Sequence, residues 1–188
     1  MKFIGDKMNI VIDATVYSGR PQEKRTAKEE HVYDVLDMLG IPFERVDHLP
    51  ADTIEACHEI EKYLNAPICK NIFLTNNKKD FFCLLLTDGD KKYEAGIVSR
   101  QLGSSRLSFA SAEYLDMYLG LTAGSVSIMG LLNDSANKVI LAVDSDLLKN
   151  EFFCCHPCLN TSTVKIRTAD IVEKFIPFTK HEMKIIYM

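Results

Sequence analysis

Two neighbouring apolar runs place the strongest constraint on how this chain can fold. Residues 68–74 and 81–86 are largely apolar, and the polar stretch 75–80 separates them. Apolar runs of this length around a polar turn are typical of the two strands of a hairpin, and their continuity indicates that the strands are largely buried. The chain must therefore supply enough further structure to cover this hairpin. Its 188 residues are sufficient for one compact domain with a sizeable core.

Further helices and strands are predicted on both sides of this hairpin. Thr26 and Glu29 form a capping box for a helix that ends at Gly40, and Asp52 with Glu55 repeats the pattern for a helix to about residue 64. Other helices are expected over 94–102, over 112–119 and from residue 168, and strands over 8–12, 41–46, 139–143, 152–154 and 163–166. Because these elements do not alternate regularly, we expect an α+β domain with a mixed sheet.

Composition narrows the class of protein and its location. Hydrophobic residues make up 47% of the chain and charged residues 26%, as in ordinary globular proteins. No apolar run approaches the ~18 residues needed to span a bilayer, and the first residues lack the apolar block of a signal peptide. We therefore expect a cytoplasmic protein without a membrane partner. Residues 1–27 are interpreted as an N-terminal arm with a candidate edge strand, and 28–188 as the main domain.

The overall charge argues against broad nucleic-acid binding. Lysine and arginine number 22 against 26 aspartates and glutamates, which gives a net charge of -4. No general positive field would therefore attract nucleic acid, so we expect no DNA partner, and an anionic partner must meet a local basic cluster.

The segment Cys155-His156-Pro157-Cys158 has the C-x-x-C spacing of thiol oxidoreductases, whose reactive cysteine opens a helix. Here a strand-like segment follows instead, which weakens the redox interpretation. A zinc site would normally use a second ligand pair, and the sequence has no second C-x-x-C. The remaining alternative is that these cysteines fill space in the core, and we expect no metal.

Signatures of nucleotide binding and of common hydrolases are missing, so we expect no cofactor. Lys70 stands in an apolar context, where a charge is costly unless it faces a cleft, an anion or solvent. Residues 124–130 contain two glycines and two serines, and the backbone N–H groups of such a loop can bind an oxygen or a phosphate. The alternatives at these positions are an outward-facing strand residue and a simple turn.

Four ordered blocks give the chain a resemblance to a known family. The blocks are 70–74, 106–111, 124–134 and 155–161. In this order they resemble the YbaK and prolyl-tRNA-synthetase-associated editing domains, above all the free-standing prolyl-tRNA editing branch. The similarity covers about residues 29–180. It implies a single domain whose mixed, mostly antiparallel central sheet is flanked by helices.

The resemblance implies a hydrolase that removes alanine from mischarged proline tRNA. Lys70 matches the lysine most closely tied to activity in such families, where its ammonium could hold a phosphate or the developing negative charge. The loop from Gly124 through Ser125, Val126 and Ser127 to Ile128 matches a G-x-x-x-P motif that grips the aminoacyl adenosine. Ile128 replaces the motif proline, which questions the rigidity of this loop. Gly130, in the same block, is included among the substrate-binding residues.

Three further residues are assigned to substrate binding through the same resemblance. His156 matches a histidine that lines the amino-acid pocket, where its bulk would admit alanine and exclude larger side chains. Asn160 belongs to the same block, and Thr53 follows a proline-containing turn, although Thr53 is equally suited to cap a helix. We expect no side-chain nucleophile, because an activated ester needs only an oriented water and a stabilised oxyanion.

The implied partner is the acceptor end of mischarged proline tRNA, with prolyl-tRNA synthetase as a candidate second partner. A local basic rim would have to bind the tRNA, or would otherwise be an ordinary solvated face. The candidate rim residues are Lys78, Lys79, Lys91, Lys92, Arg100 and Arg106. Three alternatives stay open: a deacylase of cysteinyl-proline-tRNA, a non-catalytic binding protein with the same fold, and a thiol redox protein that uses Cys155 and Cys158.

Overall fold

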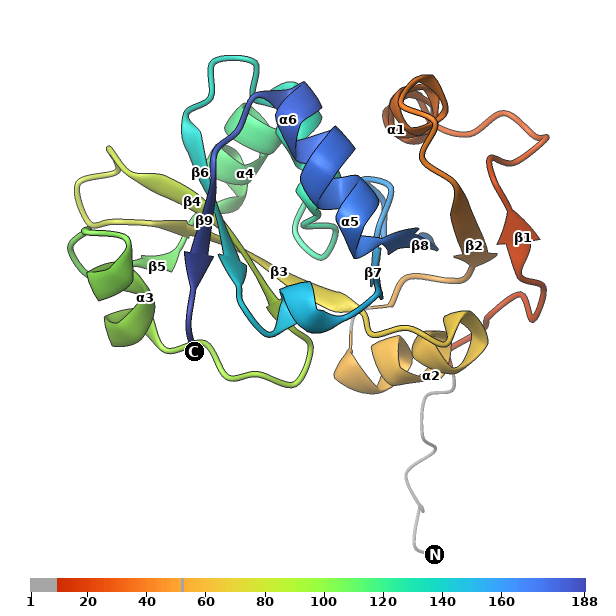
Figure 1. The fold of residues 1–188 in the computed structure, drawn as a ribbon, viewed down its shortest axis with the longest axis horizontal. Coiled ribbons are helices and arrows are strands. Elements are labelled where there is room, and N and C mark those ends of the chain that lie inside the picture. The colour runs from red at the N-terminus through yellow and green to blue at the C-terminus, as the bar shows by residue number, and fades with distance from the viewer. Residues whose placement is uncertain (1–9, 52) are drawn as a thin grey trace, which may run out of the picture.

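A computed structural model describes residues 10–51 and 53–188. Two β-sheets lie next to each other and carry helices around them (Figure 1). Their strand orders are β1-β2-β8-β7 and β5-β3-β4-β6-β9. The strands are β1 Tyr17–Ser18, β2 Phe43–Asp47, β3 Cys69–Thr75, β4 Phe82–Asp88, β5 Ser108–Phe109, β6 Val139–Asp144, β7 Phe152–Cys155, β8 Ser162–Arg167 and β9 Met183–Ile186. Only the β4–β6 and β6–β9 pairs among them are parallel, which confirms the predicted α+β domain with a mixed, mostly antiparallel sheet.

The predicted hairpin is confirmed as the antiparallel pair β3–β4. Successive residues of β4 point to opposite faces of the sheet, and both faces are covered. Leu84 and Leu86 join the largest core cluster, whereas Cys83 and Leu85 join a second cluster with Val98 of helix α3 (Ala95–Gln101). Burial on both faces explains why the sequence of β4 is continuously apolar instead of alternating.

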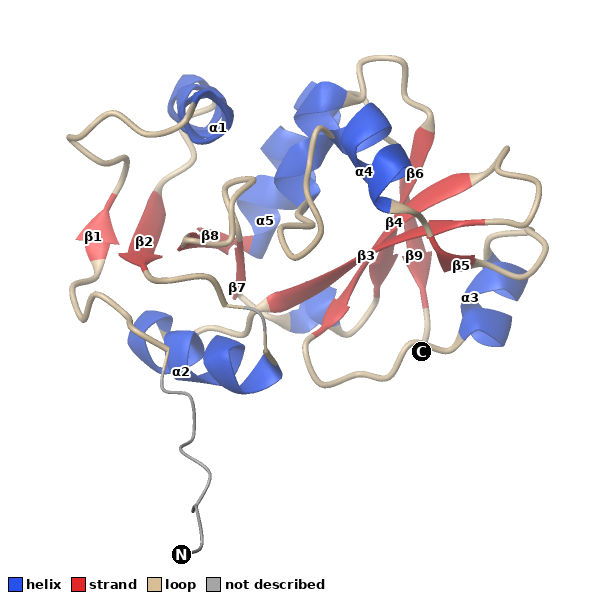
Figure 2. Cartoon of the chain, turned by 180° about the vertical axis from the view of Figure 1, so that it is seen from behind, coloured by secondary structure: helices blue, strands red, loops and turns tan. Residues whose placement is uncertain are grey.

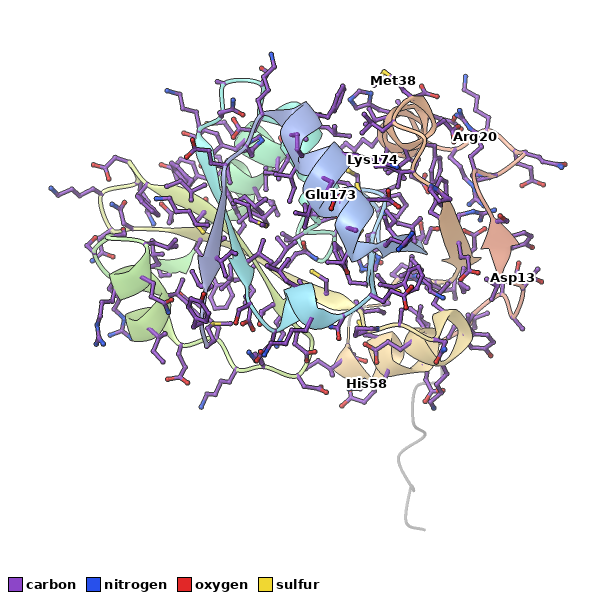
Figure 3. All side chains as sticks on the ribbon, in the orientation of Figure 1. Asp13, Arg20, Met38, His58, Glu173 and Lys174 are labelled. Atoms are coloured by element: carbon purple, nitrogen blue, oxygen red, sulfur yellow. The ribbon has the colours of Figure 1, made fainter. Side chains whose placement is uncertain are left out.

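Helix α1 (Ala27–Met38) begins with the predicted capping box between Thr26 and Glu29. The segment before it is tied to the fold, because β1 pairs with β2 and Arg20 forms ion pairs with Glu30 and Asp34 of α1. Figure 3 shows Arg20 beside this helix. Of the expected strand over 8–12, residues 8 and 9 lie outside the described residues. Ile12 makes only an isolated bridge to His48.

Helix α2 (Ile54–Leu64) begins at one of the two capping residues that the sequence suggested. Thr53, and not Asp52, occupies the N-cap, and its side chain accepts a hydrogen bond from the N–H of Ala56. Asp52 itself lies outside the described residues. Figures 1 and 2 show α2 beside the beginning of β3, while the turn between β3 and β4 lies at the other end of the sheet, near α3.

The remaining helices pack mainly on the larger core. Helix α4 (Ala112–Leu119) ends at Gly120 in the left-handed region, as its sequence predicts. A short 3-10 helix, η1 (Ile128–Asn133), stands where a loop was expected. The helix that begins at Thr168 contains a π-helical segment between α5 (Thr168–Asp170) and α6 (Ile176–Thr179). Strands β1, β5 and β9 were not predicted, because the first two have only two residues each and half of the residues of β9 are exposed.

Candidate functional site

A cavity of about 320 Å³ opens between α2, the first residues of β3 and two later segments of the chain. It brings together predicted site residues that are far apart in sequence: Lys70, Gly124, Val126, His156 and Thr53 all line it. The other lining residues are Ala51, Ile54, Cys57, His58, Glu61, Ile68, Cys69, Asn71 and Gly89. The cavity combines an apolar wall with one lysine, a backbone turn and two imidazoles, which suits a small, partly polar ligand.

Lys70 is the second residue of β3 and is half-buried. Its Nζ atom donates a hydrogen bond to the backbone carbonyl of Lys91, 2.8 Å away. An ammonium group has three donors, and within the described residues the other two have no protein partner. The side chain is therefore held at one point while keeping two N–H groups for a ligand.

The loop from Gly124 to Ile128 contributes its backbone to the cavity. Gly124 has φ +84°, a conformation that favours glycine. The N–H of Ser125 donates to Thr122, whereas the N–H groups of Gly124 and Val126 donate to no group within residues 10–51 and 53–188. Gly124 and Val126 thus line the cavity with N–H groups that are not committed to a protein acceptor in this part of the chain.

Four predicted site residues of this block do not line the cavity: Ser125, Ser127, Ile128 and Gly130. The hydroxyl of Ser127 donates to the carbonyl oxygen of His156 at 2.6 Å and accepts from the N–H of Met129. Ile128 is completely buried in the core. A Cβ at Gly130 would lie 2.6 Å from a methyl carbon of Leu121, so this glycine permits close packing. The loop is fixed by a serine cap and core packing where the family motif has a proline.

Asn160 connects two walls of the cavity without lining it. Its Nδ2 atom donates to the carbonyl of Gly124 at 3.0 Å, and its Oδ1 atom accepts from the N–H of Ala51 at 3.2 Å. Asn160 thereby links the turn at Gly124 to Ala51, which lies shortly before α2.

His156 belongs to a buried pair of histidines. Its Nδ1 atom bonds the carbonyl of Ser162 at 3.0 Å, and the hydroxyl of Thr163 lies between His156 and His48, 2.8 Å from Nε2 of His48. Burial lowers the pKa of His156 to about 4 and also lowers the pKa of His48. Both imidazoles are therefore neutral at pH 7, so His156 presents bulk and a neutral ring, not a charge.

One face of α2 completes the cavity, and the sequence interpretation missed it. Ile54, Cys57, His58 and Glu61 all line the cavity at the i, i+3, i+4 and i+7 positions of this helix. The Oε2 atom of Glu61 bonds His58 at 2.9 Å, which raises the pKa of that histidine. Figure 3 shows His58 at the edge of the molecule on α2. The helical spacing was the available signal, but polar residues on such a face resemble a solvated surface.

The thiols near the cavity are poor nucleophiles. Burial raises the pKa of Cys155 and of Cys158 to about 12, and it also raises the pKa of Cys69 well above its ordinary range. Cys155 ends β7 and does not open a helix. All six cysteines are free thiols. Since thiol exchange requires a thiolate, this environment does not favour the redox alternative.

The basic residues assigned to tRNA binding lie in two places. Lys78 and Lys79 occupy the turn between β3 and β4, and Arg100 lies in α3, at the end of the sheet away from α2 (Figure 1). Arg106 follows α3 and is exposed, as is Lys92. Lys91, by contrast, is ion-paired with Asp144. The turn residues Lys78 and Lys79 therefore lie away from the cavity, whereas Lys91 belongs to the segment whose carbonyl binds Lys70.

Two kinds of feature are absent from the described residues. No group of three or more His, Cys, Asp or Glu side chains in that part of the chain is arranged to hold a metal ion. Among the same residues, none of the helices has both the length and the apolar character that crossing a membrane requires.

Comparison with known proteins gives consistent matches over most of the chain. The model of the aminoacyl-tRNA editing domain matches residues 48–174. The prolyl-tRNA editing protein ProX of Acetoanaerobium sticklandii is 34% identical over 151 residues, covering 80% of this chain and 92% of the relative. Prolyl-tRNA synthetase associated domain-containing protein 1 of Danio rerio is 28% identical over 150 residues, covering 79% of this chain and 80% of the relative.

A solved structure also has the same fold. It is described as a proposed trans-editing enzyme for prolyl tRNA synthetase, and its TM-score is 0.65 at 16% sequence identity. The match covers 88% of this chain and 99% of that one. At this identity the likeness concerns the arrangement of helices and strands.

Proposed function

We propose a substrate for this chain, which belongs to the aminoacyl-tRNA editing domain family. The protein removes alanine from mischarged proline tRNA in trans. A member of this family is an aminoacyl-tRNA deacylase, which is a hydrolase of the ester between an amino acid and the terminal ribose. The proposal concerns the substrate: the alanyl ester at the acceptor end of proline tRNA would occupy the cavity. Residues 28–188 would form the editing domain, acting in the cytoplasm.

The observation that carries this proposal is the convergence on one cavity of Lys70, the turn at Gly124 and Val126, and His156. Hydrolysis of an ester places negative charge on the carbonyl oxygen of the tetrahedral intermediate. The free N–H groups of Lys70 and the two backbone amides are the donors that could stabilise this charge. Donors fixed before the reaction need no reorganisation as the charge develops.

Water is the proposed nucleophile. Cys57 and Cys69 line the cavity, but burial raises the pKa of both thiols, so neither is a thiolate at pH 7. The hydroxyl of Thr53 already accepts the capping bond from Ala56. In the reaction a water adds to the carbonyl carbon and the ester C–O bond breaks. One proton of the water passes to the leaving ribose oxygen, and the other passes to solvent as the alanine carboxylate forms.

His156 is the proposed size filter. Its ring is neutral and its backbone is fixed by Ser127, so the imidazole presents a rigid wall. A rigid wall can exclude proline, which is larger than alanine, through steric repulsion. The attraction of one methylene alone would give only about 1–3 kcal/mol of discrimination.

The proposal is tested with proline tRNA charged separately with alanine, cysteine or proline. Release of each amino acid is measured under single-turnover conditions. We expect rapid release of alanine, slower release of cysteine and negligible release of proline. Faster release of cysteine would reverse the assignment of the substrate, and no release of any of the three would favour a non-catalytic tRNA-binding protein. Co-purification with prolyl-tRNA synthetase tests the second partner separately.

A further inference from the structure

The ammonium of Lys70 is held by a loop that has no regular secondary structure of its own. Its partner is the carbonyl of Lys91, in the segment between β4 and α3. Backbone in an irregular loop is usually among the more mobile parts of a fold. A carbonyl there can fix a catalytic ammonium only if the loop is itself anchored. The structure contains such an anchor.

The side chain of Lys91 provides this anchor. Its Nζ atom lies 2.6 Å from Oδ2 of Asp144 and 2.6 Å from Oδ2 of Asp146, and it also donates to the carbonyl of Met188 at 3.1 Å. The side chain of Asp144 is 0% exposed. A buried carboxylate needs a partner, because leaving it unpaired is strongly unfavourable. Asp144 is thus the buried one of three acceptors through which the Lys91 side chain anchors this loop.

A second contact joins the same carboxylate to the strand beside Lys70. The hydroxyl of Thr87 donates to Oδ2 of Asp144 at 3.2 Å, and Thr87 is the cross-strand partner of Lys70. Asp144 thus reaches Lys70 from two sides, through the loop carbonyl of Lys91 and through the neighbouring strand. Neither route requires Asp144 or the side chain of Lys91 to line the cavity.

We propose that Asp144 and Lys91 form a positioning pair, which fixes the ammonium of Lys70 in the cavity through the carbonyl of Lys91. The inference rests on the proposed function, because it gives this ammonium its task. Asp144 and Lys91 are positioning residues, and they touch no substrate. Loss of the pair releases the loop carbonyl, and the ammonium then samples several positions instead of one. A catalytic group displaced by about 1 Å can lose on the order of 100-fold in rate.

The test combines turnover with a direct observation of Lys70. Asp144→Asn and Lys91→Met each remove one charge of the pair, and Lys91→Met keeps the backbone carbonyl. We expect kcat for alanine release to fall about tenfold or more, with KM within about twofold, because binding is retained while orientation is lost. Lys91→Arg, which keeps a charge able to pair with Asp144, should recover part of the loss. The NMR signal of the Lys70 side chain, observed with labelled lysine, should shift in both charge-removing variants.

Lys149→Met is the matched control. Lys149 pairs with Asp146 at 2.6 Å, but its side chain is 75% exposed and does not contact Asp144 or Lys70. We expect its turnover and its Lys70 signal to match those of the wild type. In a Lys70→Ala background, Asp144→Asn should cause no further loss of turnover, because the pair acts through Lys70.

Several results would overturn the positioning role. One is unchanged turnover in Asp144→Asn. The other is a loss of turnover from Asp144→Asn that is as large in the Lys70→Ala background as in the wild type, which would indicate general destabilisation. If the wild type releases no amino acid, the proposed function has failed. The Lys70 signal then decides the structural claim by itself: a shift in Asp144→Asn but not in Lys149→Met supports the pair, and no shift overturns it.

Discussion

At the scale of single residues, burial determines the chemistry of the cavity. His156 is 8% exposed, and its imidazole is neutral because desolvation penalises the charged form. His48 experiences the same effect, and Thr163 joins the two rings. Because His156 is neutral at pH 7, the positive charge at this part of the cavity comes from Lys70, while His58 and Glu61 pair with each other on α2.

The lowered pKa of His156 predicts a dependence of stability on pH. Its ordinary value is 6.5 and its value in the folded protein is about 4. Between pH 6.5 and pH 4 the imidazole of His156 is protonated in the unfolded state and neutral in the folded state. The stability that this residue contributes is therefore fully present above pH 6.5 and is lost as the pH falls toward 4. We expect the free energy of unfolding to fall by about 2 kcal/mol between pH 7.5 and pH 5 from this residue.

Denaturant unfolding at both pH values measures this effect, with His156→Gln as the comparison. The variant has no group to titrate at this position, so its free energy of unfolding should change less between the two pH values. Equal pH dependence in the wild type and the variant would show that His156 is not the source of the effect.

At the scale of elements, the substrate loop depends on the cap of η1. Ser127 is completely buried, and its hydroxyl links His156 to the N–H of Met129. Ser127→Ala leaves a buried carbonyl and a buried N–H without this partner, which costs about 1–3 kcal/mol. We expect a matching loss in thermal unfolding and a reduced kcat, because the loop and His156 move together.

Ser111→Ala is the control for this prediction. Ser111 stands at the N-cap of α4 but makes no side-chain capping bond, and it is exposed. Its replacement should change the free energy of unfolding by no more than about 0.5 kcal/mol. A similar loss in both serine variants would argue against a special role for the cap of η1.

Local patterns predicted the elements whose signals lie within one segment. The capping box at Thr26 and the stop at Gly120 were readable because each depends on neighbours three or four residues away. The cap of α2 stayed open between Asp52 and Thr53, because both are good capping residues and only tertiary packing distinguishes them. The 3-10 turn of η1 could not be predicted, because Ile128 is held by core contacts from distant segments.

At the scale of the whole molecule, the cavity and the basic turn residues Lys78 and Lys79 lie at different ends of the larger sheet. Lys70 begins β3, whereas Lys78 and Lys79 follow its end, roughly 20 Å farther along the strand direction. An acceptor stem that runs along the sheet could reach both places. The family pattern identified the site residues from the sequence. The distance between the cavity and the basic turn could not be predicted, because that distance depends on the direction of β3.

Salt dependence tests whether the distant basic residues bind tRNA. We expect alanine replacement of four exposed residues to raise the Kd for proline tRNA and to reduce the slope of log Kd against log salt by about 3. Each phosphate contact releases somewhat less than one counterion on binding, so the loss of four contacts lowers the slope by about this amount. The four residues are Lys78, Lys79, Arg100 and Arg106.

The matched control removes the same number of charges elsewhere on the surface. Its four exposed residues are Lys24, Lys138, Lys174 and Lys180. This variant should keep the wild-type slope. Equal changes in both fourfold variants would indicate a general charge effect and not a binding surface.

The central claim concerns the ammonium of Lys70, and the rate of alanine release by Lys70→Ala tests it most directly. Single-turnover hydrolysis of alanyl-proline-tRNA is compared with the wild type, and circular dichroism confirms that the variant is folded. We predict a loss of about 100- to 1000-fold, the usual effect of removing one oxyanion donor. A folded Lys70→Ala protein that releases alanine at the wild-type rate would contradict the claim.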